Sequence, residues 1–364
     1  MATINQDEAY MKVALGLAQR GLGLVAPNPA VGCVIVNGGV VVGRGFTQKG
    51  GRPHAETEAL QQAGERARGA TAYVTLEPCS HTGVTGPCAQ ALIDAGITRV
   101  VAAIGDPDDR VAGLGFAMLR QAGVQIEIGI CEREATLINR GFLNKVSLER
   151  PTFTLKIASS VDGKIALENG DSQWITGSVA RAYGHLLRAR HDAILVGIGT
   201  VLADDPMLDC RLPGLEDLSP QRVILDSKLR IPLDSRLVAT ARQVPTLMLS
   251  ETSDGGKINA LRSAGVTVEV LPTLSDVSVV ANKLAGQGIT RVLVEGGGRV
   301  HASFLRAGIV DRLLHFIGPK LLGGESIPMV GDLGLASLDE APHLTCTSLR
   351  RLGTDILASY EKPE

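Results

Sequence analysis

His54, Cys79 and Cys88 are residues of the types that hold zinc in catalytic sites. One imidazole and two thiolates make a three-ligand set, which leaves the fourth tetrahedral position for a water molecule. Zinc lowers the pKa of such a water towards neutrality and so makes hydroxide available as a nucleophile. Glu56 follows His54 by two residues, close enough to reach that water without binding the metal. We therefore predict that Glu56 is the general acid and base that carries the proton to a leaving nitrogen.

The order H-x-E, then P-C and a second cysteine, is typical of zinc-dependent nucleobase deaminases. This chain departs from the usual spacing, because eight residues separate Cys79 from Cys88. A structural zinc site is the alternative, since such sites close with a fourth Cys or His, and His81 could be that ligand. The other cysteines have no ligand-like spacing and are interpreted as core or incidental residues: Cys33, Cys131, Cys210 and Cys346.

A second candidate site surrounds VLVEGGGRVHASFL, in which a buried strand runs into three glycines and then a helix from near Arg299. Such a turn lets backbone N–H groups and a helix N-terminus approach a phosphate, although a plain tight turn is an equal alternative. The segment is not G-x-G-x-x-G, so the Rossmann fingerprint is absent. Trp174 is either a core residue or a flat wall for a ring, and Asp204 and Asp205 favour a turn with a helix cap.

Alternating helices and strands position the first site. Hydrophobic periodicity predicts a helix over 7–20, and two β-rich runs joined by glycines after Asn37 predict a hairpin. The other expected elements are helices from His54, at 88–95 and at 114–122, and strands at 71–75, 99–104 and 124–128. Strands that alternate with helices imply an α/β fold, a sheet covered by helices.

The second half of the chain predicts another α/β unit, which begins near residue 149. We expect strands at 153–160, 193–197, 222–225, 246–249, 267–271, 291–295, 313–317 and 355–360, and helices at 179–189 and 274–287. We place the domain boundary at about residue 148, which gives domains 1–148 and 149–364.

Composition narrows the class of protein. A chain of 364 residues is expected to form about two domains. Its 36 Lys and Arg against 38 Asp and Glu give a net charge of −2, which disfavours a nucleic-acid partner. No apolar run is long enough to span a membrane, and the first residues lack the pattern of an export signal. Six cysteines are too few for a disulfide scaffold, so a cytoplasmic protein is expected.

Seven segments together resemble the bifunctional riboflavin-biosynthesis proteins of bacteria: PNPAVGCVIV, HAETEAL, AYVTLEPCSHTGVTGPC, DGKIA, DSQWIT, VLADDP and VEGGG. The resemblance covers nearly the whole chain, in the same order. It implies a cytidine-deaminase-like α/β/α domain followed by a dihydrofolate-reductase-like α/β domain. The implied reactions are the zinc-dependent deamination of 2,5-diamino-6-ribosylamino-4(3H)-pyrimidinone 5′-phosphate and the NADPH-dependent reduction of its ribosyl group, which gives 5-amino-6-ribitylaminouracil 5′-phosphate.

The resemblance also implies roles for single residues. In the first domain, His54, Cys79 and Cys88 match the zinc ligands, Glu56 the proton shuttle and Asn28 a substrate contact. In the second domain, the residues that match NADPH contacts are Ala158, Trp174, Thr200, Asp204, Ser227, Gly297, Gly298, Arg299, Val300, His301, Ala302 and Ser303. The substrate contacts match Ser172, Arg188, Leu208, Arg211 and Glu295, and both arginines are suited to a phosphate. We expect Lys156, Asp204 and Glu295 to lie nearest the reacting ribose carbon.

Two positions depart from the family near the substrate phosphate of the first domain. Thr47 stands where the family often has a His, and Val84 where it often has a Lys or Arg. His81, Lys49 or Arg52 is expected to supply the missing charge, and His81 is our candidate substrate contact. Family members associate through the second domain, which implies a homodimer or homotetramer.

Three alternatives remain at the level of the sequence. One is a nucleic-acid deaminase with an accessory domain, which the net charge and the long gap between Cys79 and Cys88 disfavour. Another is a zinc-stabilised binding module with a degenerate second domain. The last is a homologue that retains only the reductase activity, to which Thr47 and Val84 point.

Overall fold

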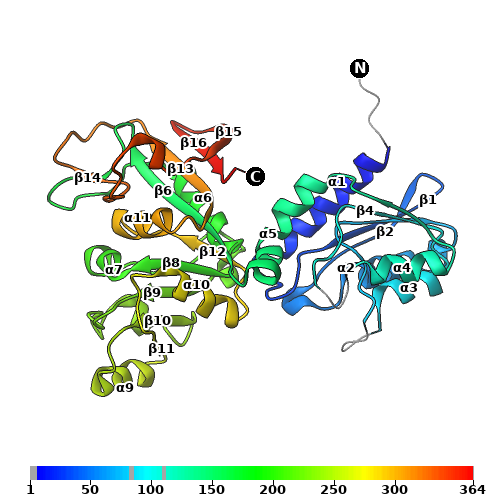
Figure 1. Cartoon of the computed structure of the whole chain (residues 1–364), viewed down its shortest axis with the longest axis horizontal. Helices are drawn as coiled ribbons and strands as arrows, with labels where there is room; N and C mark the ends of the chain where they lie inside the picture. Colours follow the sequence, from blue (N-terminus) through cyan, green and yellow to red (C-terminus); the bar gives the residue numbers. More distant parts are fainter. Residues whose placement is uncertain (1–5, 82–85, 109–111, 364) are drawn as a thin grey trace. The chain divides into compact units, whose positions relative to one another are not determined.

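The computed structural model describes residues 6–81, 86–108 and 112–363, so Val84 lies outside the described residues. The chain divides into two compact units, Met1–Arg150 and Pro151–Glu364 (Figure 1). Within the described ranges, no helix combines the length and apolar composition that crossing a bilayer requires.

The first unit is a five-stranded sheet in the order β2-β1-β3-β4-β5. β1 pairs antiparallel with β2 and β3, whereas β3, β4 and β5 are parallel. Its strands are β1 Gly32–Asn37, β2 Val40–Phe46, β3 Thr71–Val74, β4 Arg99–Ala102 and β5 Gln125–Ile128. Its helices are α1 Gln6–Ala18, α2 Ala55–Ala63, α3 Cys88–Asp94, α4 Leu114–Gln121 and α5 Glu132–Leu148.

Glycines on β1 and β2 let helices pack closely against both faces of this sheet. A Cβ atom on Gly32 would lie 1.9 Å from the carbonyl oxygen of Ala14 in α1. A Cβ on Gly45 would lie 2.2 Å from the carbonyl oxygen of Ala55 in α2. Gly45 pairs with Cys33, the neighbour of Gly32, so the two glycines face opposite sides of the pleat. α1 and α2 therefore cover opposite faces, which makes the α/β/α layering that we expected (Figure 1).

The second unit is a nine-stranded sheet in the order β11-β10-β9-β8-β12-β6-β13-β16-β15. The strands from β11 to β13 along this order are parallel, and β16 and β15 add an antiparallel edge. These strands are β6 Thr152–Ser160, β8 Ala193–Gly197, β9 Gln221–Leu225, β10 Thr246–Ser250, β11 Thr267–Val270, β12 Arg291–Val294, β13 Val310–Gly318, β15 Thr345–Leu352 and β16 Asp355–Glu361. A separate pair joins β7 Lys164–Ala166 to β14 Ile327–Pro328.

Helices cover both faces of the large sheet: α6 Ser178–Ala189, α7 Ile198–Asp204, α8 Arg236–Ala239, α9 Gly255–Ser263, α10 Val277–Gly286 and α11 Gly298–Arg306. Alternate residues of each strand belong to different cores. Leu195 packs with Val280 of α10 and Phe304 of α11, whereas its neighbour Ile194 packs with Val201 of α7. The expected α/β class of this unit is confirmed.

Several elements differ from the expectations. α10 begins three residues later than expected, because the Asp276 side chain accepts a hydrogen bond from the amide of Ser278 and so caps the helix there. Asp204 is the last residue of helix α7, where we expected a turn before a cap. The helices that no sequence pattern predicted are α5, α7, α8 and α9, and the unpredicted strands are β7, β14 and β15.

Candidate functional site

The three candidate metal ligands converge at the N-termini of two helices. His54 is the N-cap of α2 and Cys88 is the first residue of α3, while Cys79 lies in the loop after β3. The His54 Nδ1 atom lies 3.2 Å from the Cys88 Sγ atom and 3.7 Å from the Cys79 Sγ atom. The three donor atoms all lie within 4.8 Å of one another. His81 is not part of this group, so the described residues give three ligands rather than a closed set of four.

This donor set fits a tetrahedral zinc ion. Zinc bonds of about 2.0 Å to nitrogen and 2.3 Å to sulfur place neighbouring ligand atoms of a tetrahedral site about 3.5 Å apart. The donor atoms of the three residues lie at about this separation. The Cys88 thiol, the His54 ring and the Cys88 amide all hydrogen-bond to the Cys79 sulfur and lower the pKa of its thiol to about 4. Cys79 is therefore ready to bind a cation as a thiolate.

Glu56 lies on the first turn of α2, beside the metal ligands. Its side chain is buried, with 4% of the residue exposed, and it interacts with the Cys88 thiol. Burial, and then the charge of Cys79, raise the pKa of this carboxyl to about 7. Glu56 is absent from the group of converging ligand atoms, which fits a group that acts beside a metal rather than on it.

Other expected contacts of the first domain lie on neighbouring loops. Asn28 packs against the backbone of Gly51, where an added Cβ atom would lie 2.0 Å from its Nδ2 atom. The Nδ1 atom of His81 is buried and has no hydrogen-bond partner among the residues that the structure describes. The Thr47 hydroxyl is buried and accepts a hydrogen bond from the Val31 amide, 3.0 Å away. Thr47 is therefore a structural residue here.

Glu77, which no motif in the sequence singled out, holds the loop that carries Cys79. Its buried carboxylate accepts hydrogen bonds from the amides of Gly113 (3.0 Å) and Phe116 (3.2 Å) at the start of α4. A Cβ atom on Gly115 would lie 2.0 Å from the carbonyl oxygen of Pro78, so the loop and the helix are in close contact. The only signal in the sequence is an acidic residue two positions before a ligand.

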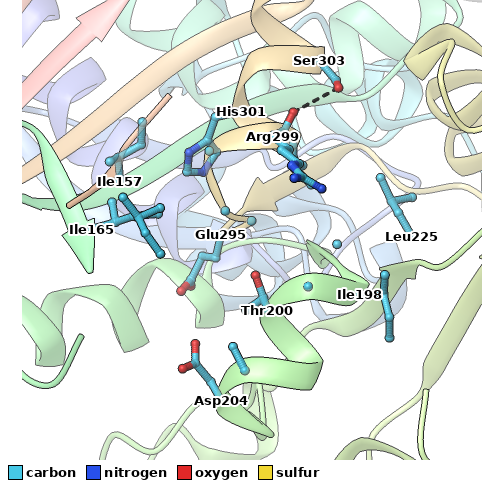
Figure 2. Close-up of a pocket in the computed structure, with 18 of the residues that line it drawn as sticks. Ile157, Ile165, Ile198, Thr200, Asp204, Leu225, Glu295, Arg299, His301 and Ser303 are labelled. Carbon is cyan, nitrogen blue, oxygen red and sulfur yellow. Dashed lines mark hydrogen bonds between the residues drawn. The ribbon is translucent and has the colours of Figure 1, made fainter. Parts of the chain in front are cut away.

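The second unit holds a cavity of about 630 Å³ at the carboxyl ends of its parallel strands. The ends of β6, β8, β9 and β12 line it, together with the glycine turn that opens α11 (Figure 2). Ligands of parallel α/β sheets bind at this edge, because the strand order reverses there and leaves a crevice. The expected cofactor residues that line the cavity are Ala158, Thr200, Asp204, Ser227, Gly297, Gly298, Arg299, Val300, His301 and Ser303.

Lys156 and Glu295 lie where this cavity meets two smaller ones, of about 330 and 500 Å³. The Lys156 Nζ atom lies 3.8 Å from a Glu295 oxygen, and Arg188 binds both oxygens of Glu295 at 2.9 Å. Burial raises the pKa of Glu295, but Arg188 and Lys156 outweigh it and lower that pKa to about 2. Burial also lowers the pKa of Lys156. The cluster therefore holds a fixed carboxylate beside a cation at the wall of the cavity.

All but one of the remaining expected residues of the second unit line the smaller cavities. Trp174 lines both of them but not the large one, and Arg181 stacks over its ring at 4.4 Å. Arg188 and Arg211 line both, and Leu208 lines the larger of the two. Ser172 lines that one and the large cavity, whereas Ala302 is buried and lines none of the three. The basic lining residues that no sequence pattern indicated are Arg181, His185, Arg230 and Arg236.

Two protein families match the chain. Residues 4–104 match the cytidine and deoxycytidylate deaminase zinc-binding region, and residues 151–358 match the RibD C-terminal domain. The first match contains all three converging ligands, and the second contains the whole strand-end cavity. The cytidine-deaminase-like fold expected for the first domain is thereby confirmed.

Similar full-length proteins exist in several bacteria. The riboflavin biosynthesis protein RibD of Aquifex aeolicus is 42% identical over 98% of each chain. That of Escherichia coli is 42% identical over 96% of this chain and 98% of its own. Among solved structures, Acinetobacter baumannii RibD is 39% identical over 99% of both chains, with a TM-score of 0.89. A diaminohydroxyphosphoribosylaminopyrimidine deaminase/5-amino-6-(5-phosphoribosylamino)uracil reductase of Thermotoga maritima is 34% identical over 98% of this chain and 99% of its own, also with a TM-score of 0.89.

Proposed function

The chain belongs to the RibD family, and from this premise we propose that it is a bifunctional enzyme of riboflavin biosynthesis. Its first domain, 1–148, would deaminate 2,5-diamino-6-ribosylamino-4(3H)-pyrimidinone 5′-phosphate. Its second domain, 149–364, would reduce the ribosyl group with NADPH to give 5-amino-6-ribitylaminouracil 5′-phosphate. The observation that carries the proposal is that one chain holds both a three-ligand metal cluster with an adjacent carboxyl and a charged strand-end cavity.

In the first domain, His54, Cys79 and Cys88 would hold a zinc ion. When bound, zinc would lower the pKa of a water and so supply the hydroxide needed to attack the amino-bearing carbon of the pyrimidine ring. Glu56 takes the proton of that water and donates it to the departing nitrogen, which leaves as ammonia. Asn28 and His81 are assigned to the substrate, because Asn28 contacts Gly51, three residues before His54, and His81 follows Cys79 by two residues.

In the second domain, the glycine turn at 296–298 and the N-terminus of α11 receive the cofactor phosphates. NADPH, when bound, supplies the hydride that reduces the ribosyl group. Glu295 and Lys156 stand at the junction of the cofactor and substrate cavities, where Glu295 would orient the ribose and the Lys156 ammonium would donate the proton that reduction adds to the sugar. Arg211, which lines the substrate side, is assigned to the 5′-phosphate. Asp204 lines the same large cavity as Glu295 (Figure 2).

No observation favours the alternatives. The similarity to RibD proteins extends over both domains, which a nucleic-acid deaminase with an unrelated accessory domain would not explain. The three ligands converge, which argues for a working metal site and against a reductase-only homologue. A cytoplasmic location and a homodimeric or homotetrameric state belong to this proposal as well.

The test is a coupled assay of the purified chain with the diaminopyrimidinone ribosyl phosphate as substrate. Ammonia release and NADPH absorbance are followed together. We expect both to change, with NADPH oxidation dependent on prior deamination. If NADPH is consumed only when deaminated substrate is supplied, the proposed first activity is wrong. If ammonia is released but NADPH is never consumed, the proposed second activity is wrong.

A further inference from the structure

The segment 27–32 of the first unit runs into β1 and carries Asn28. Three consecutive backbone amides of this segment each donate a hydrogen bond to a side chain: Ala30 to Asn139 Oδ1 at 2.9 Å, Val31 to Thr47 Oγ1 at 3.0 Å and Gly32 to Thr75 Oγ1 at 3.1 Å. The three acceptor residues are buried. Side chains from three separate parts of the chain therefore fix the path of the segment.

Asn28 is held at the start of the same segment. Its amide donates to the carbonyl oxygen of Val25 at 2.9 Å, and its Nδ2 atom donates to that oxygen at 3.3 Å. The backbone of Gly51 lies against the side chain, where an added Cβ atom would be 2.0 Å from Nδ2. Pro27 and Pro29 have no amide hydrogen, so every N–H of the segment bonds inside the protein. The Asn28 Oδ1 atom has no partner among the described residues and is an acceptor left for a substrate.

Asn139 acts on this segment from outside the metal site. It lies on α5, 109 positions from Ala30, whereas Thr47 and Thr75 lie on the segments that lead to His54 and Cys79. Asn139 can therefore be changed without altering the segments that carry the metal ligands. Its Nδ2 donor is buried and has no partner in the described part of the chain. Because an unpaired buried donor lowers the free energy of unfolding, Asn139 stabilises the fold less than a fully bonded carboxamide would.

We propose that Asn139 is a positioning residue of the deaminase: by holding the Ala30 amide, it sets the direction in which Asn28 presents its Oδ1 atom to the substrate. The inference rests on the proposed function of the first domain, in which Asn28 contacts the substrate. Only Pro29 separates Asn28 from Ala30, and the ring of a proline fixes its φ angle near −65°. A rotation of the Ala30 amide is therefore passed to Asn28 rather than absorbed between them. Loss of the Asn139 oxygen weakens the substrate contact and leaves the metal ligands in place.

The test is a double-mutant cycle on the full-length chain, followed by the KM and kcat of ammonia release from the diaminopyrimidinone ribosyl phosphate. Asn139→Leu nearly keeps the volume of the side chain and removes the Oδ1 acceptor. We expect it to raise KM about 3- to 10-fold, the range for one lost hydrogen bond, with kcat nearly unchanged. Asn28→Ala should raise KM at least as much. Because Asn139 acts through Asn28, adding Asn139→Leu to Asn28→Ala should change KM by less than about twofold.

Two further variants separate positioning from a general structural role. Asn139→Asp keeps an acceptor oxygen and should hold KM within about twofold of the wild-type value. Asn37→Leu is the matched control, because Asn37 ends β1 and bonds the backbone carbonyl oxygens of Arg66 and Arg68, apart from the segment 27–32. It should leave KM unchanged. Bound zinc and reduction of the deaminated substrate should stay at wild-type levels in every variant, which excludes a folding defect.

The proposal is overturned if the effects of Asn139→Leu and Asn28→Ala on KM multiply in the double variant, or if Asn139→Asp raises KM as much as Asn139→Leu. It is also overturned if Asn37→Leu matches Asn139→Leu, or if Asn139→Leu loses zinc, since Asn139 would then support the whole domain. An active wild-type chain whose KM is unchanged by Asn139→Leu overturns this inference alone. A wild-type chain that binds zinc but releases no ammonia overturns the proposed deaminase activity and this inference together.

Discussion

Arg188 binds Glu295 through a fork of two hydrogen bonds: Nε donates to Oε1 and Nη2 to Oε2, each at 2.9 Å. A third donor, Nη1, reaches the carbonyl oxygen of Asp209 at 3.0 Å. A guanidinium has five N–H donors in all, so Arg188 has few left for a ligand. Arg211 is different, because its side chain is 55% exposed and its only described partner is the carboxylate of Asp209, at 3.5 Å. The two arginines expected at the phosphate thus have different roles.

We predict a split in the kinetics of the second domain. Arg188→Lys keeps the charge but loses the fork, so Glu295 is less firmly oriented and kcat of reduction should fall about tenfold or more, with KM for the ribosyl substrate nearly unchanged. Arg211→Ala removes a phosphate contact and should raise that KM about tenfold or more, with kcat nearly unchanged. Steady-state kinetics with deaminated substrate measure both. Ammonia release by the first domain is the internal control, and the opposite split would contradict these roles.

A second prediction separates the metal ligands from the proton shuttle. Cys88→Ser should lower the bound zinc from one ion per chain to nearly none, because a serine hydroxyl is a far weaker ligand than a thiolate. Glu56→Gln should retain one zinc ion and lose ammonia release by at least about 100-fold, the lower range for general acid–base catalysis. Zinc is measured by atomic absorption after dialysis. Loss of zinc in Glu56→Gln would make Glu56 a ligand. Reduction of the deaminated substrate should be unchanged in both variants.

A third prediction concerns the glycine turn before α11. A Cβ atom on Gly298 would lie 2.8 Å from the carbonyl oxygen of Pro328 and 3.1 Å from the amide nitrogen of Gly331. Gly298→Ala should therefore displace the 328–331 segment, lower the free energy of unfolding by about 1–3 kcal/mol and raise KM for NADPH. Gly286→Ala is the control, because no atom lies within 4 Å of its added Cβ and it closes the exposed end of α10. Equal effects of the two substitutions would mean that the close approach at Gly298 does not matter.

Local sequence patterns explain why the buried strands, the metal ligands and the α/β class could be predicted. Continuous apolar runs such as 193–197 give buried parallel strands, and the motifs around His54, Cys79 and Cys88 placed the metal ligands within reach of one another. Each strand run and each ligand motif lies within a few residues of chain, although the three ligands themselves come from separate motifs. The α/β class of each unit followed from the alternation of such segments.

Other features depend on the folded structure. The pair of Arg188 and Glu295 joins residues 107 positions apart, because α6 packs over the end of β12. Helix α7 has the sequence IGTVLAD, in which a glycine and β-branched residues disfavour a helix, so tertiary packing of Val201 decides it. Arg230 belongs to no motif that the sequence patterns indicated, and only its position in the lining of the large cavity identifies it as a residue of this site.

His191 leads to a prediction about pH. Its ring is buried, with 4% of the residue exposed, and Nδ1 donates a hydrogen bond to the carbonyl oxygen of Leu187 at 2.6 Å. Nε2 has no hydrogen-bond partner in the described part of the chain. Burial, and then the positive charge of Arg291, lower the pKa of His191 to about 3. Below its ordinary pKa of 6.5, the unfolded chain takes up a proton that the folded chain refuses. The contribution of the neutral His191 ring to the free energy of unfolding is therefore complete above pH 6.5 and is lost as the pH falls towards 3.

The expected loss is about 1.4 kcal/mol per pH unit, the slope for one proton, so the second unit should weaken measurably between pH 6.5 and pH 5. His191→Gln should remove this part of the slope, because glutamine donates a hydrogen bond without titrating. Urea unfolding at several pH values, followed by the fluorescence of Trp174, the single tryptophan, measures it in the second unit. His343→Gln is the matched control, since His343 is exposed in the same unit and should leave the slope unchanged. If His191→Gln retains the full slope, another histidine whose pKa burial lowers carries the pH dependence: the buried His301 or the half-buried His185 or His315.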